Sequence, residues 1–382
     1  RRFAWSALDH HTYLYMDGKP RGWHSLAEGG GTKWKVNADG SPSYLTRSDL
    51  SIPPETLEVE KSQHPVAIAY MLAPFTYFFR NFQGAVESVS IIVSTLLTFV
   101  GLLALRSIFI SITNNAASAN FASAIVFLAT PLWLYGRTIF NEPFIASFAT
   151  IAYALVIRKD KLSLMRAGAT GLFFGLAMTL KPPAALLALP VFAIKLFRRD
   201  LKSIGCMAVG PILSLLGLFA QNYWITGSVF APYNKLEYIN PLVGLTGNLF
   251  SPSRGLLFFA PISILLPYGW YKLWKMGKKE AFMGLVGVIP YIVFMSSLSI
   301  WSGNTCYGPR YLVATLPLLF IGIIPMIHSE SQSGSPLTNN KWILSLISLS
   351  ILINLMSVLP YYLYWTTHPL IEVYYFLSEF RL

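Results

Sequence analysis

Long runs of hydrophobic residues, separated by short polar stretches, fill the chain from about residue 84 onwards. An apolar run of roughly 17–25 residues is the length that an α-helix needs to cross the hydrocarbon core of a bilayer, and the sequence offers about ten. We expect membrane-spanning helices at 84–106, 117–136, 142–158, 165–181, 182–198, 203–224, 255–274, 281–300, 310–328 and 342–364.

The first part of the chain departs from this pattern. Residues 1–63 hold eight of the 17 acidic residues, together with three consecutive glycines and a pair of prolines. We expect this polar segment to form an outer loop region, followed by a transmembrane domain over 81–382. Between them, residues 64–80 are apolar but short and contain prolines, which favours a helix lying in the membrane interface. Because the sequence opens on Arg1 and not on Met, and its first eight residues hold no apolar run long enough for a span, we also expect a preceding first span to be missing from it.

The composition agrees with a membrane protein. Hydrophobic residues make up 54% of the chain and charged residues only 12%, and the mean hydropathy is +0.52. A soluble domain carries about a quarter charged residues, so a soluble fold is excluded. The richness in apolar residues also excludes disorder. Cys206 falls at the inner end of a predicted span and Cys306 in an outer loop, so we expect no disulfide between them.

The net charge of +12 is unevenly placed along the chain. If residues 1–63 are outside the cell, 14 basic residues after position 80 fall on the inner side and six on the outer side. This asymmetry is the one that orients membrane proteins, so it predicts an outer N-terminal segment in the plasma membrane. The charge is thereby explained by the lipid bilayer, and no nucleic-acid partner is expected. The inner residues are Arg106, Arg158, Lys159, Lys161, Arg166, Lys195, Arg198, Arg199, Lys202, Lys272, Lys275, Lys278, Lys279 and Lys341.

Four basic residues on the outer side are exceptions to this rule, and all lie among Gly and Pro at helix ends. They are Arg137, Lys181, Arg254 and Arg310. Each long side chain could simply extend to the lipid headgroups. Their shared chemistry, however, is the recognition of anions, because Arg presents a planar fork and Lys a point charge to phosphate. A phosphate at the outer boundary of the membrane is the ligand that they would fit.

Two acidic residues are candidates on the same side. Glu142 lies in the segment NEPF at the start of a predicted helix, where a carboxylate is favoured by the helix dipole. It could alternatively lie near Arg137 and bind substrate or metal. Asp9, in LDHHTYLYM, is either a solvated loop residue or a general base that takes a proton from an acceptor hydroxyl. With His10 it could also belong to a metal site.

Five segments in this order resemble the GT-C glycosyltransferases, in particular membrane transferases related to the protein O-mannosyltransferases and the aminoarabinose transferases. The segments are SQHPVAIAYMLAPF, YGRTIFNEPFIASFA, GLFFGLAMTLKPPAALLALP, FSPSRGLLFFAP and WSGNTCYGPRYLVATLP. The resemblance covers nearly the whole chain. It implies an all-α polytopic membrane protein with a GT-C-like helical bundle.

The resemblance also implies an activity. Members transfer a sugar from a polyprenyl-phosphate-linked donor to a glycan, lipid or protein acceptor on the outer face of the membrane. By position, Asp9 matches the family's catalytic base of an inverting displacement, although His10 stands where Glu is usual. The cations Lys181, Arg254 and Arg310 would bind the donor phosphate. Some members use a divalent cation, and this sequence shows no ligand set. Further candidates for contacts with substrate or metal are Glu142, Arg137, His64, His10 and Tyr307.

Two other classes of function remain open from the sequence. Many spans with outer cations would also suit a transporter or flippase of an anionic lipid or solute. A transporter is expected to place charges or broken helices near the bilayer midplane and often has two related halves. The charges in this sequence lie instead at helix ends, and its halves are not visibly related. The third reading is a non-catalytic subunit of a membrane complex.

Overall fold

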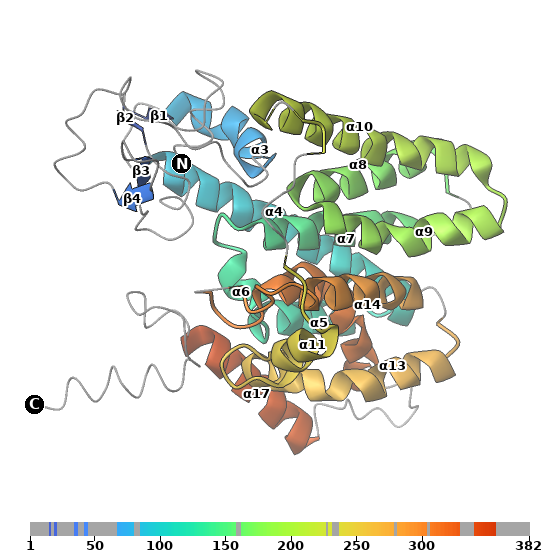
Figure 1. Cartoon of the computed structure of the whole chain (residues 1–382). Helices are drawn as coiled ribbons and strands as arrows, with labels where there is room; N and C mark the ends of the chain where they lie inside the picture. The colour runs from blue at the N-terminus through green and yellow to red at the C-terminus, as the bar shows by residue number, and fades with distance from the viewer. Residues whose placement is uncertain are drawn as a thin grey trace, which may run out of the picture. The chain divides into compact units, whose positions relative to one another are not determined.

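The structure of the chain, a computed structural model, is almost entirely helical where it is described, which confirms the predicted all-α class (Figure 1). Asp9, His10 and His64 lie outside the described residues. The described ranges are 15–16, 19–20, 34–36, 42–44, 67–79, 85–157, 162–226, 228–230, 237–278, 281–303, 306–328 and 340–356.

The chain divides into two compact units, the first comprising Arg1–Leu96, Thr138–Asn141 and Leu216–Lys235. Its described strands form two antiparallel pairs, and its first described helix lies within the segment predicted to be interfacial. That helix contains Pro74 and continues into a 3-10 turn; its location at the membrane interface stays a prediction. The elements are β1 (Tyr15–Met16) with β2 (Lys19–Pro20), β3 (Trp34–Val36) with β4 (Pro42–Tyr44), α3 (Ala67–Thr76) and η3 (Tyr77–Phe79).

The second unit comprises Leu97–Arg137, Glu142–Leu215 and Leu236–Leu382 and contains most of the helices. In chain order the helices from α4 to α10 are α4 (Ala85–Thr113), α5 (Ala116–Leu128), α6 (Leu132–Tyr135), α7 (Asn141–Ile157), α8 (Leu164–Leu180), η4 (Pro182–Ala184), α9 (Ala185–Phe197) and α10 (Leu201–Thr226). The later ones are α11 (Pro241–Phe250), α12 (Leu256–Phe259), η5 (Pro261–Leu265), α13 (Leu266–Lys275), α14 (Phe282–Ser296), η7 (Arg310–Thr315), α15 (Leu316–Leu319), η8 (Phe320–Ile323), α16 (Ile324–Ile327) and α17 (Lys341–Met356).

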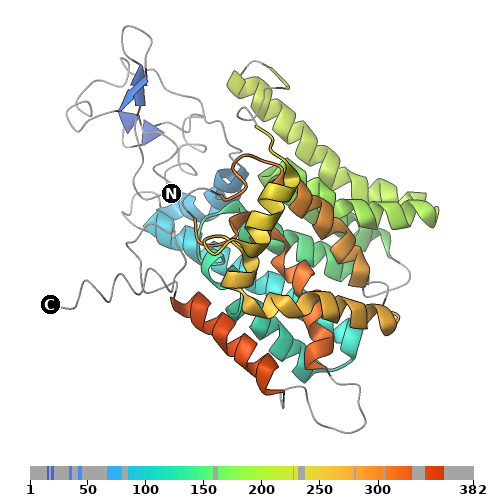
Figure 2. The same cartoon turned by 60° about the horizontal axis from the view of Figure 1, so that its bottom comes forward.

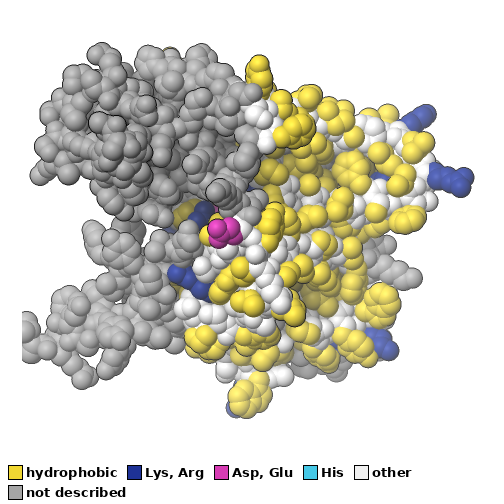
Figure 3. Space-filling model, viewed as in Figure 1, with side chains coloured by type: hydrophobic (Ala, Val, Ile, Leu, Met, Phe, Trp, Pro, Cys, Tyr) yellow, Lys and Arg dark blue, Asp and Glu magenta, His cyan; other side chains and the backbone are white. Residues whose placement is uncertain are grey.

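Within the described residues, three helical segments are long and apolar enough to cross a membrane: Ser88–Thr113, Leu201–Tyr223 and Arg310–Ile327. Seven shorter apolar helices accompany them. The first two leave most of their apolar window exposed, as lipid-facing helices do, whereas the window of the third is 89% buried. Hydrophobic side chains likewise cover most of the described surface seen in Figure 3, where charged side chains are few. The chain is therefore an integral membrane protein.

Several predicted spans are interrupted in the structure. The run 255–274 is divided into α12, η5 and α13, because Pro261 disfavours the helical conformation of Ala260, whose φ and ψ are −144° and 73°. The run 310–328 alternates between 3-10 and α turns, and 117–136 is split between α5 and α6. The short helix α11 was not predicted. Proline placement within apolar runs accounts for the first of these interruptions.

The helices pack closely where glycine removes the side chain. A Cβ atom on Gly210 of α10 would lie 2.1 Å from the carbonyl oxygen of Gly171 on α8, so these backbones touch. In the same unit α9 packs against α14 (Figure 2), and the buried hydroxyl of Tyr153 donates to the carbonyls of Leu187 and Met283, which lie on these two helices. This packing fixes the helix ends that carry the candidate site.

Candidate active site

Glu142 is the centre of the polar cluster in the second unit. It lies in the first turn of α7 and is followed by Pro143, which is well suited to this position because its ring presets a helical φ. The sequence explains the helix start, but not the surroundings of the carboxylate, whose residue has 0% exposure. A carboxylate removed from water in this way must be paired with a cation or be protonated.

Lys181 supplies the first cation. Helix α8 ends at Leu180, and Lys181 is extended with φ −149° and ψ 117°, the conformation favoured before proline. The chain then turns at Pro182 into η4 and α9. From this corner the Lys181 ammonium nitrogen lies 2.5 Å from Oε1 of Glu142 and 4.3 Å from the ring centre of Tyr311. The Lys-Pro-Pro sequence thus places the lysine at a helix junction facing the cluster.

Arg310 supplies the second cation, at the first residue of η7. Its Nε donates to the same Oε1 of Glu142 at 3.1 Å, and its Nη1 donates to Sγ of Cys306 at 3.3 Å. The preceding Gly308 has a φ of +56°, and a Cβ atom there would lie 2.8 Å from the ring of Phe259. Only glycine meets both conditions without strain. The segment Tyr-Gly-Pro-Arg therefore has a structural reason for its glycine.

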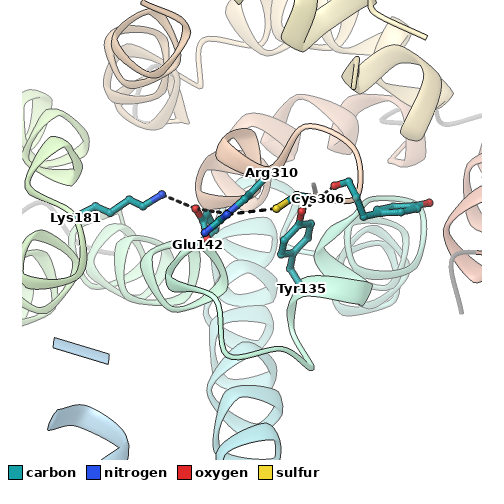
Figure 4. A network of polar contacts seen from close by, with 6 residues as sticks. Tyr135, Glu142, Lys181, Cys306 and Arg310 are labelled. Atoms are coloured by element: carbon teal, nitrogen blue, oxygen red, sulfur yellow. Dashed lines mark hydrogen bonds and ion pairs between the residues drawn. The ribbon is translucent and has the colours of Figure 1, made fainter. Parts of the chain in front are cut away.

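The three charges form a compact triad in which two cations share one carboxylate oxygen, as Figure 4 shows. The side chains of Lys181 and Arg310 retain 17% and 22% exposure, so both can meet a ligand. The other oxygen of the carboxylate, Oε2 of Glu142, has no hydrogen-bond partner within the described part of the chain. The hydroxyl of Tyr291 is also buried without such a partner there. The triad carries a net charge of +1 and retains unused hydrogen-bonding capacity.

Arg254, the third predicted phosphate ligand, is buried in a different segment. It lies in the turn before α12 and is 7% exposed. Burial raises the pKa of the Cys306 thiol, and the guanidinium groups of Arg310 and Arg254 partly offset this effect. The thiol is therefore neutral at pH 7. The structure thus brings together Lys181 and Arg310, which lie far apart in the sequence.

Tyr307 and Arg137 form contacts within the protein, and their contacts with substrate or metal stay predictions. The Tyr307 hydroxyl donates to the carbonyl of Ile353 at 3.1 Å, and its own carbonyl accepts from the buried Tyr135 hydroxyl at 2.8 Å. Arg137 lies over the ring of Trp133, with 5.1 Å between the guanidinium carbon and the ring centre. The ion-pair partners of Glu142 in the structure are Lys181 and Arg310 and do not include Arg137.

Sequence reasoning did not select Tyr135, Cys306 or Tyr311 for the site. In the sequence, the only indication of a role in the site was that they adjoin Gly136, Tyr307 and Arg310 within the segments quoted above. In the ranges that the structure describes, no three His, Cys, Asp or Glu side chains are grouped to hold a metal ion. What the arrangement supplies is a partly exposed, positively charged cluster suited to a phosphate or another anion.

No protein-family model and no curated protein matches the sequence. Among solved structures, the chain is similar to ArnT from Cupriavidus metallidurans, a crystal structure bound to undecaprenyl phosphate. The alignment has 16% identity and a TM-score of 0.46, and it covers 78% of this chain. The chain spans 62% of the length of that structure. The function is therefore argued from the residues of this chain.

Proposed function

We propose that this chain is a GT-C-type glycosyltransferase, related in kind to the mannosyl- and aminoarabinosyl transferases, that uses a polyprenyl-phosphate-linked sugar. The observation that carries the proposal is the triad of the buried Glu142 with the partly exposed Lys181 and Arg310. Cations buried in a membrane protein need a function or a partner, because isolated charges are costly there. A triad with one acid for two cations leaves a positive charge that a phosphate would neutralise.

The proposed reaction is an inverting displacement. An acceptor hydroxyl oxygen attacks the anomeric carbon, the bond from that carbon to the phosphate oxygen breaks, and the electron pair leaves with the lipid phosphate. The hydroxyl proton passes to a carboxylate base, for which Asp9 stays a prediction. Negative charge grows on the leaving phosphate, so preorganised cations at Lys181, Arg254 and Arg310 would stabilise the transition state.

The test compares two lysines that are both ion-paired and largely shielded from solvent. Lys181 pairs with Glu142 in the site, whereas Lys195 pairs with Asp200 at 3.2 Å near the end of α9. Wild type, Lys181→Met and Lys195→Met are reconstituted in nanodiscs and titrated with undecaprenyl phosphate. We expect Lys181→Met to raise the Kd by about thirtyfold or more, the range for truncating one partner of a buried charge pair. Lys195→Met should leave the Kd within about twofold of wild type, since additivity between distant sites is the rule.

Transfer is then measured with polyprenyl-phosphate sugars and a panel of glycan, lipid and protein acceptors. Release of polyprenyl phosphate by wild type, lost in Asp9→Asn while donor binding persists, supports the full proposal. Binding of the lipid phosphate with no transfer to any acceptor, together with its movement between leaflets, would indicate a flippase instead. Equal effects of the two lysine variants on the Kd would contradict a phosphate site at the triad.

A further inference from the structure

Helix α17, the last helix that the structure describes, forms hydrogen bonds with two segments of the chain. One segment follows Arg254 and the other precedes Arg310. Asn354 and Ser350 of α17 are fully buried polar residues in a mainly apolar helix. Polar side chains within a membrane bundle are costly unless they have a partner or a function, so their hydrogen bonds indicate what they do. Both residues bond to one segment of backbone, and the neighbouring Ile353 bonds to a second segment.

The first segment is the break between α12 and η5. In a continuous helix the carbonyl of Phe259 would accept from Ser263, but that amide donates to Ala260 instead. The Nδ2 of Asn354 donates to the Phe259 carbonyl at 2.7 Å. Likewise the amide of Ile262, which has no partner within the broken helix, donates to Oγ of Ser350 at 3.0 Å. Side chains of α17 therefore satisfy the backbone groups that the break leaves over.

The second segment is the loop that leads to Arg310. The hydroxyl of Tyr307, three residues before Arg310, donates to the carbonyl of Ile353 in α17. The Tyr307 ring meets the Phe259 ring edge-on, with 4.8 Å between centres, and so joins the two segments. Phe259 follows Arg254 by five residues. One end of α17 is thus bonded to the segments that carry two of the three cations.

We propose that α17 is a clasp that positions Arg310 and Arg254 for phosphate binding, with Asn354 and Tyr307 as its positioning residues. This inference rests on the proposed function for its consequence, but the clasp itself is a property of the unliganded protein. Both residues act by fixing the loop backbone from which the guanidinium groups project.

A ligand-independent measurement tests the clasp. Cys306 lies next to Tyr307 in the clasped loop and is 4% exposed, and Cys206 is the chain's other cysteine. In a Cys206→Ser background, the rate of labelling by N-ethylmaleimide reports on opening of the loop. We expect Tyr307→Phe and Asn354→Leu to raise this rate about tenfold, as the loss of one net hydrogen bond at about 1.4 kcal/mol would give.

The matched control is Tyr153→Phe. This variant also removes a buried hydroxyl bonded to backbone carbonyls, but those carbonyls belong to Leu187 in α9 and Met283 in α14 and not to α17. We expect a comparable fall in thermal stability with no change in the labelling rate of Cys306. An unchanged labelling rate in Tyr307→Phe and Asn354→Leu, or an equal rise in Tyr153→Phe, would overturn the clasp.

The functional consequence is measured separately by titration with undecaprenyl phosphate in nanodiscs. The clasp variants should raise the Kd about fivefold to tenfold at unchanged binding stoichiometry, and Asn354→Gln, which keeps the amide donor, should recover part of the affinity. A normal Kd in variants with faster labelling would overturn the positioning role. If wild type does not bind the lipid phosphate, the proposed function fails and the labelling rates alone decide whether the clasp exists.

Discussion

Replacing Glu142 by Gln is expected to change stability and anion affinity in opposite directions. Gln keeps an acceptor oxygen for Lys181 and Arg310 but removes the negative charge that both cations share. Removing one partner of a buried ion pair costs about 3–5 kcal/mol. Because both cations keep partial exposure to solvent and the acceptor remains, we expect a free energy of unfolding lower by about 3 kcal/mol, the lower end of that range.

The same substitution removes a charge that competes with a bound phosphate. A phosphate on the far side of the two cations, about 6 Å from the carboxylate, is repelled by about 1–3 kcal/mol at an effective dielectric constant of about 20–40. We therefore expect the Kd for undecaprenyl phosphate to fall about tenfold in Glu142→Gln. The assay pairs a lipid titration in nanodiscs with unfolding by SDS in mixed micelles.

Asp200→Asn is the matched control, because it makes the same acid-to-amide change in the second ion pair, with Lys195. It should leave the Kd unchanged. A higher Kd in a folded Glu142→Gln protein would refute the competition argument, and would mean that the carboxylate contacts the ligand or holds the cations in their binding geometry.

Three further predictions concern other parts of the molecule. Gly210→Ala should destabilise the protein by about 1–3 kcal/mol in SDS unfolding, the usual range for overpacking, because the new Cβ would meet the Gly171 carbonyl. Gly205→Ala, on the same helix with open space around it, should leave the stability unchanged. Arg310→Ala should weaken lipid phosphate binding by about 2–5 kcal/mol, and an unchanged affinity would count against its role. Hydrogen bonds from Ser203 and Lys195 lower the pKa of Asp200, so its contribution to stability is present above pH 3.8 and is lost as the pH falls further. Wild type and Asp200→Asn should therefore differ in thermal stability at pH 7 and converge in acid.

Hydrophobic patterning was sufficient to predict an all-helical membrane protein and the positions of most helices, because span length is set by the bilayer and not by tertiary contacts. It did not predict the interruptions. Whether Pro261 breaks a helix depends on whether the freed backbone groups find hydrogen-bond partners. Here the partners are the side chains of Ser350 and Asn354, about 90 residues later in the chain.

The candidate site was predictable in part. Basic residues on the predicted outer side of the membrane drew attention to Lys181 and Arg310, since the positive-inside rule provides a background against which exceptions stand out. The partner of Glu142 was not predictable, because Arg137 is near in sequence while Lys181 and Arg310 are near only in the folded chain. Likewise, nothing in the sequence distinguished Tyr307 as a structural residue from a ligand-binding one.

The central claim is that Lys181 and Arg310 bind the phosphate of a polyprenyl lipid, and an experimental structure with undecaprenyl phosphate tests it most directly. The account predicts a phosphate group at about 3 Å from the Lys181 ammonium and the Arg310 guanidinium, the distance of charge-assisted hydrogen bonds. A phosphate bound elsewhere, with both cations still held only by Glu142, would contradict it.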